Sequence, residues 1–200
     1  ANNLKVNLVR IESDYLKPNE IKNKLKSVSG ILIPGGFGKR GTEGKIAAIN
    51  YARKNKIPFL GICFGMQAAV IEYARNVLNW EDANTSEVDP KSSHKVIDLM
   101  EEQKNITDMG GTMRLGACDC KLTDRSIAKQ VYKRTNISER HRHRFEFNSA
   151  YKEDFEKAGM KATGTNPETG LVEIVEIPSH PWFVGVQYHP EYKSTVANPH

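Results

Sequence analysis

The sequence has 200 residues, 38% of them hydrophobic and 26% charged, which is enough chain to bury one core and predicts a single globular domain over residues 1–200. Its formal net charge of +5 comes from Lys and Arg scattered among 24 acidic residues, so a solvated surface is favoured over a nucleic-acid interface, with small anionic substrates as the second choice. No apolar run approaches the roughly eighteen residues of a membrane span and no signal peptide is evident, so we expect a cytoplasmic protein without membrane contact.

The first half of the chain alternates predicted strands and helices. Residues 5–11 alternate in polarity and predict a strand, residues 18–26 carry helical spacing, and residues 30–34 form a short apolar run typical of a parallel strand buried on both faces. The same order then repeats, with a helix over 42–54, a strand over 57–60 and a helix over about 64–78. This alternation indicates an α/β fold whose central, mostly parallel sheet has helices on both faces.

The second half is richer in predicted strands. The expected strands cover 96–100, 112–122, 171–177 and 183–188, and the expected helices cover 125–132 and 149–158. Gly159 lies where a helix of that length would end in a left-handed residue. We therefore expect a smaller antiparallel region beside the parallel sheet.

One cysteine lies between two glycines at a predicted strand-to-helix turn, in Gly61-Ile62-Cys63-Phe64-Gly65. This pattern is typical of a nucleophile elbow, in which the chain turns so tightly that its neighbours must lack side chains. The helix N-terminus should favour the thiolate of Cys63, and the N–H of Phe64 would be free to bind an oxyanion. The alternative is that Cys63 is a small buried apolar residue.

A second glycine-rich turn, PGGFG at residues 34–38, also follows a buried strand. Parallel pairing would bring its backbone N–H groups to the same sheet edge as the elbow. A phosphate-binding loop is the weaker reading, because the run lacks both the GKS/T of a P-loop and the full GxGxxG spacing. We interpret it as the second oxyanion donor.

His189-Pro190-Glu191 directly follows the last predicted strand. A cysteine nucleophile needs a base, and that base needs an orienting acceptor, so His189 and Glu191 are residues of the right types. Separately, a lone histidine at a strand end and a nearby glutamate are more often structural. Together with the elbow and the glycine turn, they favour a catalytic site.

The remaining cysteines, Cys118 and Cys120, are two residues apart on a predicted strand, a spacing that does not match a CxxC zinc site. Three cysteines cannot all pair, so we expect Cys63, Cys118 and Cys120 to be reduced. No metal site is predicted.

The runs GICFGMQ (61–67) and YHPE (188–191) resemble the class I glutamine amidotransferases. The resemblance implies hydrolysis of L-glutamine through a glutamyl thioester, with Cys63 as nucleophile, His189 as general base and acid, and Glu191 as the orienting carboxylate. It also implies a set of glutamine- and oxyanion-binding residues: Gly36, Phe64, Gly65, Met66, Gln67, Glu87 and Arg144. Glu87 would take the substrate ammonium, and Arg144 its carboxylate.

Four further runs are similar to one branch of that family: RNVL (75–78), DANTSE (82–87), GGTMRLG (110–116) and ERHRHRFE (139–146). In that branch an N-terminal amidoligase domain uses the ammonia to aminate ATP-activated UTP, and we expect that domain to be absent from residues 1–200. For the whole enzyme the resemblance implies Mg²⁺, GTP as activator and a tetramer. It implies no cofactor in the glutaminase domain. The branch commonly has Leu at Phe64 and Tyr at Phe145. The ERHRHR run alone would be weak evidence for RNA binding.

Two alternative functions remain open on the sequence. The chain could be the glutaminase of another amidotransferase, against which the GGTMRLG and ERHRHR runs argue. It could also be a non-catalytic module that docks on or regulates a synthetase domain, which the intact Cys63, Gln67, His189 and Glu191 disfavour.

Overall fold

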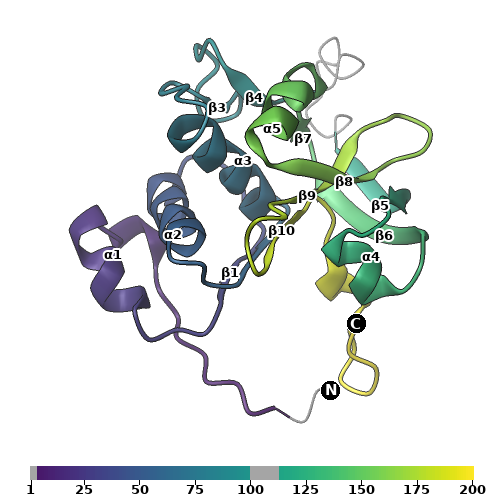
Figure 1. Ribbon diagram of the computed structural model, residues 1–200, viewed down its shortest axis with the longest axis horizontal. Helices are drawn as coiled ribbons and strands as arrows, with labels where there is room; N and C mark the ends of the chain where they lie inside the picture. The colour runs from purple at the N-terminus through teal and green to yellow at the C-terminus, as the bar shows by residue number, and fades with distance from the viewer. Residues whose placement is uncertain (1–3, 100–112) are drawn as a thin grey trace.

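The computed structural model describes residues 4–99 and 113–200 (Figure 1). Residues 110–112 of the GGTMRLG run therefore lie outside the described residues, as do residues 100 and 112, each at one end of an expected strand. In the described part, the strands form one seven-stranded and one three-stranded sheet.

The large sheet has a parallel part and an antiparallel part. Strands β1 (Ile31–Ile33), β2 (Phe59–Ile62) and β10 (Phe183–Val186) pair in parallel. The antiparallel pairing then continues through four more strands: β9 (Val172–Glu176), β8 (Lys161–Thr165), β5 (Arg114–Leu122) and β6 (Asn136–His143). The predicted α/β class, with its antiparallel region, is confirmed.

Helices cover both faces of this sheet. They are α1 (Pro18–Leu25), α2 (Thr42–Lys54), α3 (Phe64–Asn76), α4 (Ile127–Tyr132) and α5 (Lys152–Ala158). In β10, Phe183 belongs to the core formed with α2 and α3, whereas Val184 and Val186 belong to the core formed with α4. This two-residue alternation places the two cores on opposite faces, and Figure 1 shows α1 to α3 on one side of the fold and α4 on the other.

The small sheet consists of β3 (Asn84–Thr85), β4 (Lys95–Leu99) and β7 (Phe145–Phe147). Strand β3 runs parallel to β4, and β4 runs antiparallel to β7. The C-terminal end of β3 and the N-terminal end of β7 therefore point to the same side of this sheet. Short 3₁₀ helices complete the described elements at Ser13–Tyr15, Ser149–Tyr151 and Pro190–Lys193.

The strand predicted for residues 5–11 is wrong. This segment has no regular secondary structure, and its apolar side chains are exposed: Leu4 79%, Val6 74%, Leu8 78% and Val9 63%. Alternating polarity favours a strand only where a neighbouring strand supplies hydrogen bonds and a buried face, and no described strand pairs with these residues.

Candidate active site

The elbow has the strained geometry that the sequence predicted. Cys63 lies between β2 and α3 with φ 52° and ψ −106°, a backbone conformation that residues with side chains rarely adopt. A Cβ on Gly61 would lie 2.6 Å from the carbonyl carbon of Gly65, and one on Gly65 would lie 2.2 Å from the carbonyl oxygen of Ile33. Both glycines are therefore required by contact with backbone, and Cys63 stands at the tip of the turn.

His189 is held from three sides beside the elbow. Its Nδ1 lies 2.7 Å from Oε1 of Glu191, its ring stacks on Tyr192 at 4.4 Å, and its backbone N–H donates to the carbonyl of Arg140 in β6 at 2.8 Å. The other ring nitrogen, Nε2, is buried and has no hydrogen-bond partner among the described residues. His189 is thus an oriented imidazole with one nitrogen available for proton transfer.

A small cleft of about 250 Å³ joins these groups. It is lined by Pro34, Gly35, Gly36, Phe37, Cys63, Arg142, His189, Glu191 and Tyr192. A Cβ built on Gly35 would lie 2.8 Å from Cε1 of His189 and 3.6 Å from Cβ of Cys63, so the imidazole and the cysteine flank the same point. The two glycine-rich turns and the His-Pro-Glu run therefore meet at one edge of the sheet, as predicted.

The expectation of a thiolate at Cys63 needs correction. Burial raises the pKa of the Cys63 thiol to about 12, and the N–H of Phe64, which lowers it, only partly offsets that effect. The carboxylates of Glu146, Glu191 and Glu87 raise it further. Desolvation outweighs the helix N-terminus here, so the thiol must pass its proton to a base before it can attack.

Glu87 and Arg144 come from the small sheet. Glu87 follows the C-terminal end of β3, and Arg144 precedes the N-terminal end of β7. Because these two strand ends point to the same side of the small sheet, both residues lie on that side. Glu87 Oε1 accepts a hydrogen bond of 3.1 Å from the N–H of Gly38 in the glycine turn. Burial raises the pKa of Glu87, while that N–H and the charge of Arg144 lower it. The structure thus brings these two predicted residues together beside the PGGFG turn.

The other predicted binding residues differ in which of their groups a substrate could contact. No described group accepts from the N–H of Gly36, which lines the cleft. The side chains of Phe64 and Met66 are buried, at 2% and 0% exposure, and Gly65 packs on β1. Only backbone groups of these residues could therefore contact a substrate. The ring of Phe64 fills the core where the resembling branch has Leu, and Phe145 is also buried.

Gln187 and Tyr192 were missed by sequence reasoning. Gln187 Nε2 lies 3.8 Å from the sulfur of Cys63, and its side chain is fully buried. A glutamine that continues the apolar run Phe183–Val186 must find buried partners, and this was the available signal. Tyr192 could be anticipated only from the fold, because it stacks on a residue three positions away through the turn of a 3₁₀ helix.

A buried ionic cluster lies behind the site, and we call Arg114, His141, His143, Glu146 and Glu173 the Arg114 cluster. Arg114 contacts Glu173 at 2.7 Å and Glu146 at 3.2 Å, and the two histidines contact each other at 2.8 Å. Burial raises the pKa of Glu146 to about 8 and lowers that of His141 to about 3. The basic ERHRHR run is therefore split, with its histidines inward and Arg140 and Arg142 exposed.

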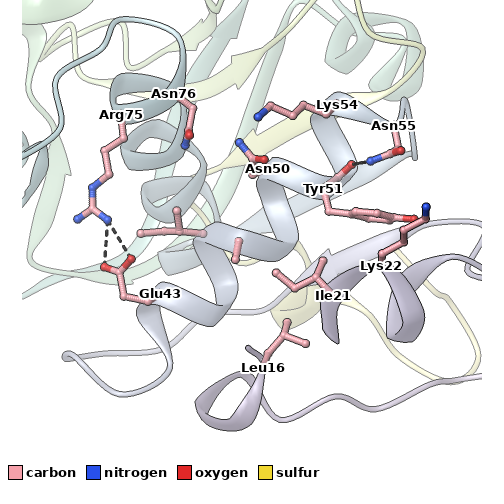
Figure 2. A pocket seen from close by; sticks show the side chains of 12 residues that line it. Leu16, Ile21, Lys22, Glu43, Asn50, Tyr51, Lys54, Asn55, Arg75 and Asn76 are labelled. Carbon is pink, nitrogen blue, oxygen red and sulfur yellow. Dashed lines mark hydrogen bonds and ion pairs between the residues drawn. The ribbon is translucent and has the colours of Figure 1, made fainter. Parts of the chain in front are cut away.

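A larger pocket, of about 540 Å³, lies elsewhere, between α1, α2 and α3 (Figure 2). Its wall carries the ion pair of Arg75 with Glu43, and Leu16 and Ile21 face it from the other side. None of the predicted site residues lines it. Among residues 4–99 and 113–200, no three or more His, Cys, Asp or Glu are arranged to hold a metal ion, and no helix in that part has the length and apolar character of a membrane span.

A cysteine at a strand-to-helix elbow, facing a His–Glu pair carried by the next parallel strand, matches a known class. The chain belongs to the class I glutamine amidotransferases, because the family model "Glutamine amidotransferase class-I" matches residues 1–200. Within that class it is a glutaminase domain of the CTP synthase type.

The similarity to CTP synthases covers the chain from end to end. CTP synthase of Flavobacterium johnsoniae is 57% identical over 200 residues, 100% of this chain and 37% of that protein. CTP synthase of Porphyromonas gingivalis is 59% identical over 198 residues, 99% of this chain and again 37% of the relative. The chain thus spans little more than a third of the curated relatives it matches.

One solved structure supports this assignment, and a more distant one supports the fold. The glutaminase domain of Trypanosoma brucei CTPS, with bound acivicin, is 42% identical with a TM-score of 0.92, covering 98% of this chain and 77% of that one. A putative GMP synthase protein of Thermoplasma acidophilum is 13% identical with a TM-score of 0.58, covering 89% of this chain and 68% of that one, and shows the fold alone.

Proposed function

We propose that this chain hydrolyses L-glutamine to glutamate and ammonia at Cys63. The observation that carries the proposal is the paired arrangement of His189: Nδ1 is bonded to Glu191 at 2.7 Å, and Nε2 is buried, without a partner among the described residues, in a cleft shared with Cys63. A thiol whose pKa is raised to about 12 needs such a base. The chain's membership of the glutamine amidotransferases names the substrate class.

The proposed reaction has two halves. His189 takes the proton of the Cys63 thiol, the sulfur attacks the side-chain amide carbon of glutamine, and the N–H groups of Gly36 and Phe64 bind the oxyanion. The carbon–nitrogen bond then breaks as His189 returns the proton to the leaving nitrogen, giving ammonia and a glutamyl thioester. Water that loses a proton to His189 attacks the thioester, and glutamate departs as the thiol is reprotonated. Glu191 orients His189 throughout.

In the longer protein to which the relatives point, we propose that residues 1–200 form the single glutaminase domain and supply ammonia to an amidoligase domain. That domain would aminate UTP in an ATP- and Mg²⁺-dependent reaction, with GTP as activator and a tetramer as the assembly. The identity to CTP synthases over the whole chain supports this role. The free thiols of Cys63, Cys118 and Cys120 suit a reducing compartment such as the cytoplasm.

The direct test is to incubate the chain with L-glutamine and measure glutamate and ammonia, with and without the synthetase domain supplied. We expect equal amounts of both products, at a weak rate that rises when the synthetase domain is present. Acivicin, a glutamine analogue bound in the Trypanosoma brucei structure, should label Cys63. A chain that neither releases glutamate nor is labelled would instead be a docking or regulatory module.

Gly35→Ala should lower kcat for glutamine roughly a hundredfold, because the new Cβ would lie 2.8 Å from Cε1 of His189 and must displace the imidazole. Gly30→Ala is the matched control at the other end of β1, where the Cβ would meet Pro58 at an ordinary 3.6 Å. The readouts are kcat and the thermal unfolding temperature of both variants. A Gly35→Ala enzyme with parental kcat would contradict the placement of His189.

Glu87→Gln should raise KM for glutamine by roughly tenfold or more, since a carboxylate that bonds an ammonium is replaced by a neutral amide. Glutaramate, which is glutamine without its α-amino group, separates this effect from a disturbed Gly38 turn, because it has no ammonium to lose. The variant and the parent should hydrolyse glutaramate with similar kcat/KM. Equal losses on both substrates would mean that Glu87 acts only by holding the turn.

A further inference from the structure

A chain of buried amide groups runs from a backbone carbonyl to the sulfur of Cys63. Gln67 Nε2 donates to the carbonyl oxygen of Phe145 at 2.9 Å and to Oε1 of Gln187 at 3.2 Å. Gln187 Nε2 then points at Sγ of Cys63 from 3.8 Å. The side chains belong to residues with 3% and 0% exposure, so water does not compete for these contacts.

The carbonyl of Phe145 fixes the direction of this chain. A carbonyl oxygen only accepts hydrogen bonds, so the nitrogen of Gln67, and not its oxygen, must face it. That nitrogen also faces the side chain of Gln187, which must therefore turn its oxygen toward Gln67. The remaining end of the Gln187 amide is its nitrogen, and it is the end that reaches the sulfur. The donor presented to Cys63 is thus set by an acceptor two side chains away.

The backbone holds both glutamines in place. The N–H of Gln187 donates to the carbonyl of Glu173 at 2.8 Å, and the N–H of Gln67 donates to the carbonyl of Cys63 at 3.1 Å within the first turn of α3. The amide that faces the sulfur therefore does not have to be ordered when the reaction begins.

The side-chain sulfur of Cys63 has different hydrogen-bond partners as a thiol and as a thiolate. On the thiol, the S–H can donate to the carbonyl of Arg142, 3.9 Å from Sγ. A thiolate can only accept, and Gln187 Nε2 offers it an N–H. We propose that Gln187 is a catalytic residue that stabilises the Cys63 thiolate formed during the glutamine hydrolysis proposed above, and that Gln67 orients it; this inference rests on that proposed function.

The charged surroundings of Cys63 explain why such a donor is useful. Carboxylates act on the sulfur from three elements, namely Glu87 after β3, Glu146 in β7 and Glu191 in the 3₁₀ helix that follows β10. Each of them disfavours a negative sulfur when it is ionised. The N–H of Phe64 and the amide of Gln187 are the described donors that favour the thiolate.

The test measures the reactivity of the sulfur without glutamine. The chain is alkylated with iodoacetamide at several pH values between about 7 and 10, and modification of Cys63 is followed by peptide mass spectrometry. Gln187→Met keeps the length of the side chain and removes the donor, so Cys63 should be alkylated about tenfold more slowly at each pH, which corresponds to an apparent pKa about one unit higher. Gln130→Met, the same change on the exposed face of α4, should alkylate at the parental rate.

A double-mutant cycle separates orientation from packing. Gln67→Met should slow alkylation in the same direction but less, and adding it to Gln187→Met should cause no further loss, since Gln67 acts through Gln187. Parental alkylation in a folded Gln187→Met protein, or additive effects in the double variant, would overturn the proposal. If Gln187→Met does not fold, Gln67→Met carries the test, and parental alkylation in it overturns the role of the amide chain. Failure of the parent chain to hydrolyse glutamine would instead remove the proposed function, which is measured separately.

Discussion

Cys63→Ala should abolish glutamine hydrolysis, with kcat falling by at least about a thousandfold, because removal of the nucleophile leaves only binding and the oxyanion donors. The structure supports this expectation, because Cys63 is the cysteine at the elbow and lines the same cleft as His189. Glutamate release is the measurement, and thermal unfolding checks the fold. Cys63 contributes only a small buried side chain, so the variant should remain folded.

His189→Ala should cost a similar factor, and the double variant Cys63→Ala, His189→Ala should be no slower than either single variant. Groups that act as one unit show such non-additive losses. Cys118→Ala is the matched control, because that thiol is half-buried on β5, outside the cleft. Release of glutamate by Cys63→Ala at the parental rate would remove the assignment of the nucleophile, and additive losses would show that Cys63 and His189 do not work on the same bond.

The sequence predicted those parts of the site whose residues are close together in the chain. Gly61 and Gly65 flank Cys63 because backbone atoms occupy the space of their side chains, and such a requirement is visible in five consecutive residues. His189 and Glu191 meet through a turn of two residues, which is also local. The helix over 42–54 was predicted with the bounds that α2 has, because its apolar spacing needs no distant partner to be recognised.

The parts that could not be predicted depend on distant partners. Strand β6 was missed because its inward residues include Glu139, His141 and His143, which do not form an apolar alternation. The partners of Glu139 are Lys193 and His200, and those of the two histidines are Glu173 and Glu146, all distant in the sequence or on another strand. The thiol pKa of Cys63 was predicted in the wrong direction, since its burial comes from the whole fold. The role of Gln187 required the position of Gln67, 120 residues away.

Arg114→Met should destabilise the fold by roughly 3–5 kcal/mol, the usual cost of removing one partner from a buried ion pair. Arg114 contacts Glu173 at 2.7 Å and Glu146 at 3.2 Å, and the two carboxylates are almost fully buried. Without the guanidinium, any negative charge on these two buried carboxyl groups has no cation among the described residues beside it to offset it. For a chain of this size the thermal unfolding temperature should fall by roughly 10 °C, as measured by calorimetry or circular dichroism.

The pH dependence of this loss distinguishes an electrostatic cause from simple loss of packing. Burial raises the pKa of Glu146 to about 8, and the charge of Arg114 lowers it from a still higher value. Below about pH 8 Glu146 is protonated in both proteins, so it adds little to their difference. Above that pH it ionises in the parent but is held protonated in the variant, so the destabilisation should grow as the pH rises through about 8.

Replacing Glu146 and Glu173 by neutral amides tests whether their charge causes the loss of stability. Arg114→Met combined with Glu146→Gln and Glu173→Gln should recover much of the lost stability and lose the pH dependence, because no uncompensated charge remains buried. Arg40→Met, which removes an exposed arginine paired with Asp14, should leave the unfolding temperature nearly unchanged. A loss in Arg114→Met that neither grows with pH nor responds to the carboxamide substitutions would show that Arg114 stabilises β5, β7 and β9 by packing and not by charge.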